Sequence, residues 1–207
     1  MSMNEHIEWC DAWVTGADED GLPRALLVGD SIAQSYFPRV EKDLSGKFLC
    51  ARLATSKCVC DPAFQRELEL VVTGYDFSVV HFNNGLHGWA YDEVSYERHL
   101  PLAFDLIARL APSSRTIWAS TTPVRKWHSL HDLDPKTERV RHRNRIADAC
   151  AASRGIPVND LYALVVDHPE YFSEDGTHFN SDGLTVVGRR VAESIATRRT
   201  SSPAALR

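Results

Sequence analysis

Short apolar runs alternate with longer amphipathic segments along most of this chain. The short runs combine apolar, β-branched and aromatic residues between polar turns, which predicts buried strands. We expect these strands at 25–29, 48–53, 77–82, 116–120 and 156–158. Segments in which apolar residues recur every three or four positions predict helices. These are expected at 31–44, 62–70, 95–110, 137–153 and from Ser181 onward.

This alternation predicts a fold of the α/β class. Strands connected by helices form βαβ units, which require a parallel sheet covered on both faces. The sequence therefore predicts a three-layer α/β/α sandwich with a five-stranded parallel sheet, flavodoxin-like in outline. We expect residues 1–198 to form one domain and residues 199–207, where the period is lost, to be a disordered tail.

Two residues predict the limits of the fourth helix. Thr137 is expected to cap its start, and Gly155 is expected to end it in a left-handed conformation.

Composition and charge narrow the classes of function. The chain has 207 residues and a net charge of -5, which argues against a dominant nucleic-acid surface. Its longest apolar stretch, 161–166, is far shorter than a membrane-spanning helix. The first residues lack the basic start and apolar run of a secretory signal, so we expect a cytoplasmic protein without membrane partners.

The sequence predicts no metal or cofactor. The five cysteines are odd in number and scattered, which favours reduced thiols over a disulfide framework. Cys58 and Cys60 have the wrong spacing for a zinc knuckle, and no second ligand pair lies nearby in the sequence.

Ligands of parallel α/β sheets bind at the carboxyl ends of the strands, so we examined the residues that follow each strand. Gly29-Asp30-Ser31 follows the first strand and places a serine at a helix start, where the helix dipole favours developing negative charge. Taken alone, the tripeptide is better explained as a helix cap.

Two more polar segments occupy comparable places. Asn83-Asn84-Gly85 follows the third strand, where an asparagine amide can donate to an oxyanion, although an Asn-Gly turn is equally common at a strand end. Asp175 precedes His178 by three residues just before the last helix, so its carboxylate can fix the tautomer of the imidazole.

Together, these segments make the chain similar to the SGNH hydrolases, also called the GDSL esterase family. Gly29-Asp30-Ser31 resembles the first block of that family, and Asp175-Gly-Thr-His178 resembles its last block. The resemblance covers about residues 24–196. It implies that Ser31 is a nucleophile, His178 its general base and Asp175 the group that orients the imidazole.

The two middle blocks depart from the family pattern. The third block of the family reads Gly-x-Asn-Asp, whereas this chain reads Phe82-Asn-Asn-Gly85. Aligning the strand end favours Asn84 as the oxyanion donor over Asn83. The second block supplies a glycine N–H, and Ala54 takes that place here. The resemblance thus implies an oxyanion hole made by the N–H groups of Ser31 and Ala54 and the amide of Asn84.

Two loops are expected to line the substrate site, together with Asp30 beside the nucleophile. They are rich in aromatic, basic and histidine side chains, which suit a sugar better than a long acyl chain. The expected contacts are His87, Trp89, Arg125 and Trp127. The alternative for the two tryptophans is that they only pack the loops.

We therefore expect a serine esterase that removes an O-acetyl group from a carbohydrate. A short-chain acyl ester or thioester is the alternative substrate, and a non-catalytic carbohydrate-binding relative is the alternative class. The sequence leaves the oligomeric state open.

Overall fold

The computed structural model describes residues 3–197, and its centre is one six-stranded sheet. The strands lie in the order β1-β3-β2-β4-β5-β8. Five of them are parallel, and β1 is an antiparallel edge strand paired with β3. Their bounds are β1 (Cys10–Val14), β2 (Arg24–Gly29), β3 (Leu49–Thr55), β4 (Phe77–Phe82), β5 (Arg115–Ala119) and β8 (Val158–Asn159).

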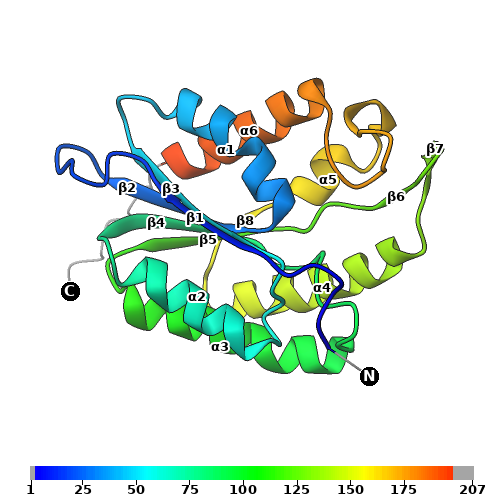
Figure 1. Cartoon of the computed structure of the whole chain (residues 1–207), viewed down its shortest axis with the longest axis horizontal. Coiled ribbons are helices and arrows are strands. Elements are labelled where there is room, and N and C mark those ends of the chain that lie inside the picture. The colour runs from blue at the N-terminus through cyan, green and yellow to red at the C-terminus, as the bar shows by residue number, and fades with distance from the viewer. Residues whose placement is uncertain (1–2, 198–207) are drawn as a thin grey trace, which may run out of the picture.

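Helices cover both faces of the sheet and make three layers (Figure 1). One face carries α1 (Ser31–Asp43), α5 (Leu161–Val165) and α6 (Ser181–Ala196). The other face carries α2 (Pro62–Val72), α3 (Glu93–Leu110) and α4 (Lys136–Ser153). The predicted α/β/α sandwich with five parallel strands is confirmed.

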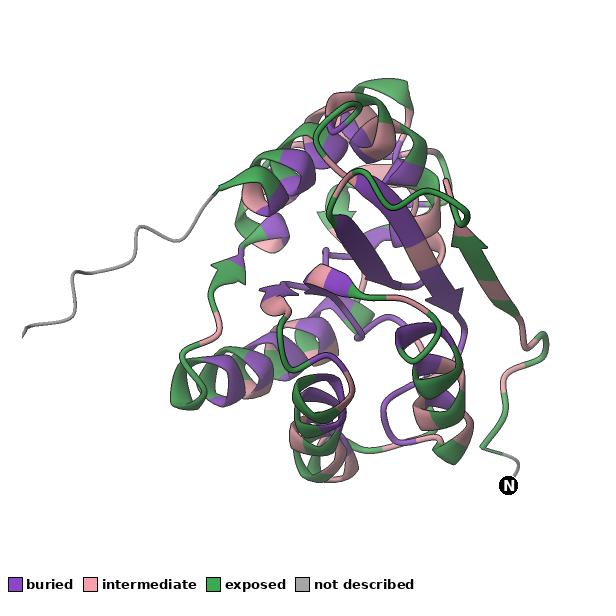
Figure 2. Ribbon diagram, turned by 90° about the vertical axis from the view of Figure 1, so that its left-hand side faces the viewer, coloured by how far each residue is buried: buried purple, intermediate pink, exposed green. Residues whose placement is uncertain are grey.

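Alternation along β2 divides the apolar core between the two faces. Leu26 and Val28 pack toward α2, α3 and α4, whereas Ala25 and Leu27 pack toward α1 and α6. All four side chains are fully buried, because β2 is central in the sheet and covered by both helix layers. Figure 2 shows buried strands between the helices of the two layers. The carboxyl end of β2 is therefore fixed by packing on every side.

Three strands lie outside the sequence prediction. The first, β1, has three exposed positions among its five residues and so gives little apolar signal. The others, β6 (Arg125–Lys126) and β7 (Ser129–Leu133), form a separate antiparallel hairpin. The predicted tail at 199–207 lies outside the described residues. No helix within residues 3–197 is long and apolar enough to cross a membrane.

The start of α4 differs from the prediction. Thr137 lies inside the helix rather than capping it, because Pro135 occupies the cap position. The Thr137 hydroxyl accepts from the N–H of Val124 at 3.0 Å and donates to the Val124 carbonyl, which ties α4 to the strand region before β6. Gly155 follows the helix with a φ of 64°, as predicted for its terminator.

We expect Leu27→Ala to lower the free energy of unfolding by about 2–5 kcal/mol, since it would leave a cavity under α1. Leu70→Ala, on the exposed surface of α2, is the matched control and should change it by less than about 0.5 kcal/mol. Chemical denaturation measures both. Equal effects would contradict the division between core and surface described above.

Candidate functional site

Ser31 is held at the junction of β2 and α1, at the carboxyl edge of the sheet. Asp30 is the N-cap of the helix, and its Oδ1 accepts the N–H of Ile32 at 2.9 Å. Gly29 is needed here because a Cβ at that position would lie 2.6 Å from the Cβ of Ala33. The tight turn thus presents Ser31 at the first position of α1, near the positive end of the helix dipole.

His178 meets Ser31 from the loop before α6. The Ser31 Oγ lies 2.8 Å from the His178 Nε2, although the two residues are 147 positions apart. The His178 Nδ1 lies 2.6 Å from the Asp175 Oδ2. With the carboxylate accepting at Nδ1, the Nε2 of a neutral imidazole is an acceptor and can take the serine proton.

Asp175 is ordered by its own loop. Its Oδ1 accepts the backbone N–H groups of Thr177 and His178, both at 2.9 Å. Burial raises the pKa of Asp175, but the hydrogen bonds from His178 and from the two backbone groups outweigh it and leave the pKa below its usual value. Asp175 is therefore ionised over the neutral range, as an orienting acceptor must be.

A close backbone contact fixes the position of this loop. The N–H of Arg125 donates to the Gly176 carbonyl at 2.7 Å, which joins β6 to the loop. Gly176 has a φ of 71°, and a Cβ there would lie 2.2 Å from the Arg125 carbonyl oxygen. Only glycine fits both conditions.

The two asparagines after β4 differ in whether an amide hydrogen is left for a ligand. Asn83 uses both amide hydrogens, on the Ala119 carbonyl at 2.8 Å and on the Thr121 hydroxyl at 3.1 Å. Asn84 donates to the Lys57 carbonyl at 2.8 Å, and within residues 3–197 its second amide hydrogen has no hydrogen-bond acceptor. Of the two, Asn84 keeps a donor to offer, which favours the sequence prediction.

Steric contact explains why a glycine follows Asn84. A Cβ at Gly85 would lie 2.1 Å from the Thr121 hydroxyl oxygen. The aspartate that the SGNH pattern places at this position has no room here.

The prediction that Ala54 supplies an oxyanion donor is wrong. Ala54 lies inside β3 opposite Asp11 of the edge strand β1. Along an antiparallel pair of strands, every second pair of opposed residues is hydrogen-bonded. Ser56, two residues after Ala54, belongs to such a pair, because its N–H donates to the Trp9 carbonyl. The Ala54 N–H therefore faces the Asp11 carbonyl, and the unpredicted strand β1 is the reason for the error.

The loop beyond β3 offers a different N–H group. Asn84 clamps this loop, because its Oδ1 accepts the Val59 N–H at 3.0 Å while its amide bonds to Lys57. Cys58 lies between these two contacts, and its own N–H has no acceptor among the described residues. The Ser31 N–H, at the first position of α1, is likewise without an acceptor in residues 3–197.

Two predicted substrate contacts are structural instead. Arg125 is only 3% exposed, and its guanidinium donates to backbone carbonyls at Leu130, Val165 and Val166 while lying over Phe172. It is buried, so the prediction that it binds substrate is wrong.

Trp89 is half-buried, and two guanidinium groups, of Arg139 and Arg143, lie 5.3 and 4.9 Å from its ring centroid. Arg143 is itself fully buried and donates to the carbonyls of Gly85 and His87. Trp89 packs the loop after β4, which is the alternative interpretation of this residue.

The remaining predicted contacts lie at different places. Asp30 is buried beneath the nucleophile as the helix cap, and its Oδ2 has no partner in the described residues. Trp127 is 69% exposed on the β6–β7 hairpin, where it stacks on His128. His87 is half-buried, with its Nδ1 2.9 Å from the Glu5 Oε2.

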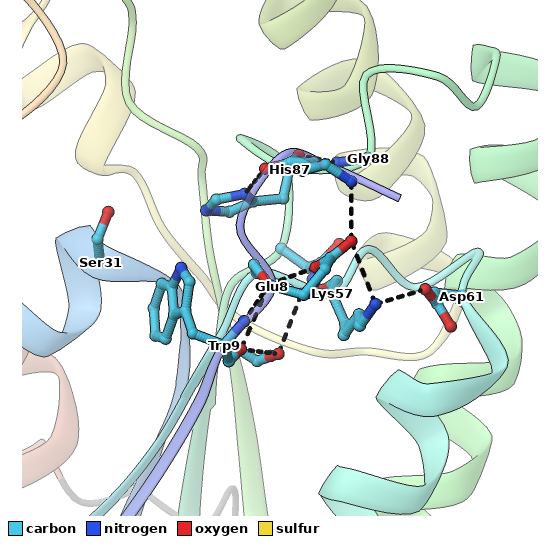
Figure 3. A network of polar contacts seen from close by, with 12 residues as sticks. Glu8, Trp9, Ser31, Lys57, Asp61, His87 and Gly88 are labelled. Atoms are coloured by element: carbon cyan, nitrogen blue, oxygen red, sulfur yellow. Dashed lines mark hydrogen bonds and ion pairs between the residues drawn. The ribbon is translucent and has the colours of Figure 1, made fainter. Parts of the chain in front are cut away.

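Sequence reasoning missed the segment before β1. Glu8 pairs with Lys57 at 3.2 Å and accepts from the Ser56 hydroxyl at 2.6 Å, which ties this segment to the loop after β3 (Figure 3). Burial raises the pKa of Glu8, but the hydrogen bonds from Ser56 and Lys57 hold it below its usual value. Its residues show no periodicity or motif, and only the fold brings them to the site.

No three His, Cys, Asp or Glu side chains within residues 3–197 are grouped so as to hold a metal ion.

We expect Gly176→Ala to displace the loop that carries Asp175 and His178. Gly46→Ala is the matched control, because Gly46 has a similar φ of 73° but open space around it. The control should cost about 1–2 kcal/mol of folding free energy from backbone strain alone. Gly176→Ala should cost about 1–3 kcal/mol more from the clash with Arg125. Chemical denaturation compares them, and equal losses would show that the contact does not constrain the loop.

Comparison with known proteins gives matches in structure only. No protein-family model matches the chain, and no curated protein matches it in sequence. An acetyl xylan esterase superposes with a TM-score of 0.66 at 16% identity, covering 83% of this chain and 99% of its own. A GDSL-like lipase from Bacteroides thetaiotaomicron gives 0.66 at 16% identity, covering 83% and 87%.

A carbohydrate esterase family 3 protein from Talaromyces cellulolyticus gives a TM-score of 0.65 at 14% identity, covering 84% of this chain and 96% of its own. These matches extend over most of both chains. The chain has the fold of the SGNH hydrolases, the GDSL family that its sequence motifs resemble.

Proposed function

We propose that this protein is a serine esterase that hydrolyses small esters, with the O-acetyl group of a carbohydrate as the favoured substrate. The observation that carries the proposal is the continuous set of hydrogen bonds from Ser31 through His178 to Asp175. It lies at the carboxyl edge of a parallel sheet, where such folds bind their ligands.

The proposed reaction begins with attack of the Ser31 Oγ on the ester carbonyl carbon. His178 takes the hydroxyl proton at Nε2 as the new C–O bond forms, and Asp175 stabilises the resulting imidazolium. The tetrahedral intermediate collapses, and His178 returns the proton to the departing alcohol oxygen. Water then attacks the acyl-enzyme by the same route and releases the carboxylic acid and free Ser31.

The developing oxyanion needs donors on the opposite side of the carbonyl from His178. We assign this role to the N–H groups of Ser31 and Cys58 and to the second amide hydrogen of Asn84. All three donors lack an acceptor within the described residues, and Asn84 holds the Cys58 loop on either side. A donor held in place by other contacts needs no reorganisation during the reaction.

The choice of substrate rests on the character of the site and on the matched structures. The residues around Ser31 are polar and aromatic, and the matches include an acetyl xylan esterase and a carbohydrate esterase. A short-chain acyl ester or thioester is the alternative substrate. A protein that binds carbohydrate without turnover is the alternative class, and the hydrogen-bonded Ser31–His178 pair argues against it.

We expect a fluorophosphonate probe to label Ser31 stoichiometrically, with loss of fluoride, and to leave Ser31→Ala unlabelled by intact mass. Ser181 is the matched control, since it begins a helix after the cap Asn180, as Ser31 does after the cap Asp30, but has no histidine partner in the described residues. Ser181→Ala should be labelled like the wild type. A folded wild type that is not labelled would contradict the proposal and favour the binding alternative.

We expect Asn84→Ala to reduce kcat for acetate release by about 10²–10³-fold, which is the usual cost of one oxyanion donor. The same substitution removes the clamp on the Cys58 loop, so its free energy of unfolding must be measured in parallel. Unchanged kcat in a folded Asn84→Ala protein would remove Asn84 from the mechanism.

A further inference from the structure

The antiparallel direction of β1 brings the residues before it, rather than after it, to the edge of the sheet that carries Ser31. Trp9 is paired with Ser56 through hydrogen bonds at both its N–H and its carbonyl, and so extends the β1–β3 pair to the carboxyl end of β3. Ser31 follows β2, the next strand along. Two strand spacings, or about 10 Å, thus separate the two chain segments.

Trp9 also lies on the same face of the sheet as the nucleophile. Trp13 shares a cation–π partner, Arg52, with Phe37 of α1, so Trp13 points to the α1 face. Side chains four residues apart on an extended strand share a face, which places Trp9 there as well. Figure 3 shows the Trp9 indole on the side of Ser31, with the polar contacts behind it.

His87 completes a wall with Trp9. Their rings meet edge to face with centroids 6.2 Å apart, so the wall joins the segment before β1 to the loop after β4. The Nδ1 of His87 faces the Glu5 carboxylate, which leaves Nε2 without a hydrogen-bond partner in residues 3–197. In the neutral ring with Nδ1–H facing Glu5, that nitrogen is an acceptor, and Figure 3 shows it directed toward the side of Ser31.

The charged groups behind this wall are already paired with one another. Glu5 accepts from the Gly88 N–H and faces His87, each at 2.9 Å. Glu8 pairs with Lys57, which also pairs with Asp61 at 3.2 Å. The wall therefore offers a substrate one half-buried indole and one imidazole nitrogen, Nε2, that has no partner in residues 3–197.

We propose that Trp9 and His87 form the subsite for the sugar ring of the substrate alcohol. The apolar C–H face of a neutral pyranose fits against the indole, and a ring hydroxyl can donate to the His87 Nε2. Trp9 thereby takes the place that the sequence had suggested for Trp89, whose ring lies against two arginines. This inference deepens the esterase proposal and rests on it for the position of the ester.

The test compares two acetate esters that differ only in the alcohol. Acetate release is measured for a mono-O-acetylated methyl β-xyloside and for ethyl acetate, using wild type, Trp9→Ala, Trp9→Phe and Trp13→Ala. Trp13 is the matched control, because it lies on β1 and on the same face as Trp9, but about 13 Å further along the chain.

We expect Trp9→Ala to lower kcat/KM for the sugar ester about tenfold through KM, and to leave that for ethyl acetate within about twofold. Trp9→Phe should recover part of the loss, and Trp13→Ala should match the wild type. An equal change for both esters in Trp9→Ala, or no change for either, would overturn the subsite.

A binding measurement separates this inference from the esterase proposal. Saturation-transfer NMR follows the acetylated xyloside on Ser31→Ala and on the Ser31→Ala, Trp9→Ala double variant. Binding that is lost only in the double variant supports the subsite even if the wild type releases no acetate, in which case the esterase proposal alone fails. Equal binding by both proteins would overturn the subsite whatever the activity.

Discussion

The hydrogen bond between Ser31 and His178 forms only if the rest of the fold places two distant chain segments accurately. It joins the first turn of α1 to the loop before α6, across 147 positions of sequence, and it tolerates little error in either partner. The serine is placed by the packed strand β2 and the tight turn at Gly29. The histidine is placed by a loop whose carboxylate, carbonyl and left-handed glycine are each tied to a neighbour. Both partners are thus fixed by rigid contacts rather than by each other.

Much of this arrangement could be predicted from the sequence because its signals are local. The five parallel strands and the main helices follow from apolar period, and β4 lies at the predicted residues. Gly29, Asp30 and Ser31 are neighbours, and Asp175 is three residues from His178, so short motifs contain their geometry. The same holds for the left-handed Gly155 after α4.

The errors arose where a residue depends on a partner far away in the chain. The sequence around Ala54 suggests an oxyanion donor, because nothing in it reveals that β1 pairs with this residue. In the sequence, Arg125 resembles an exposed loop residue. In the structure, its guanidinium donates to the carbonyl groups of three residues elsewhere in the chain. Trp9 gave no signal, since a single aromatic residue before a half-exposed strand has no period and no motif.

The segment before β1 forms its described contacts with residues from the first half of the chain. Every partner described for the segment before β1 lies within the first 88 residues, on β3, the loop after it and the loop after β4. Synthesis runs from the N-terminus, and a domain generally folds as a unit. All of these partners therefore precede the loop that carries Asp175 and His178 in the chain and are synthesised before it.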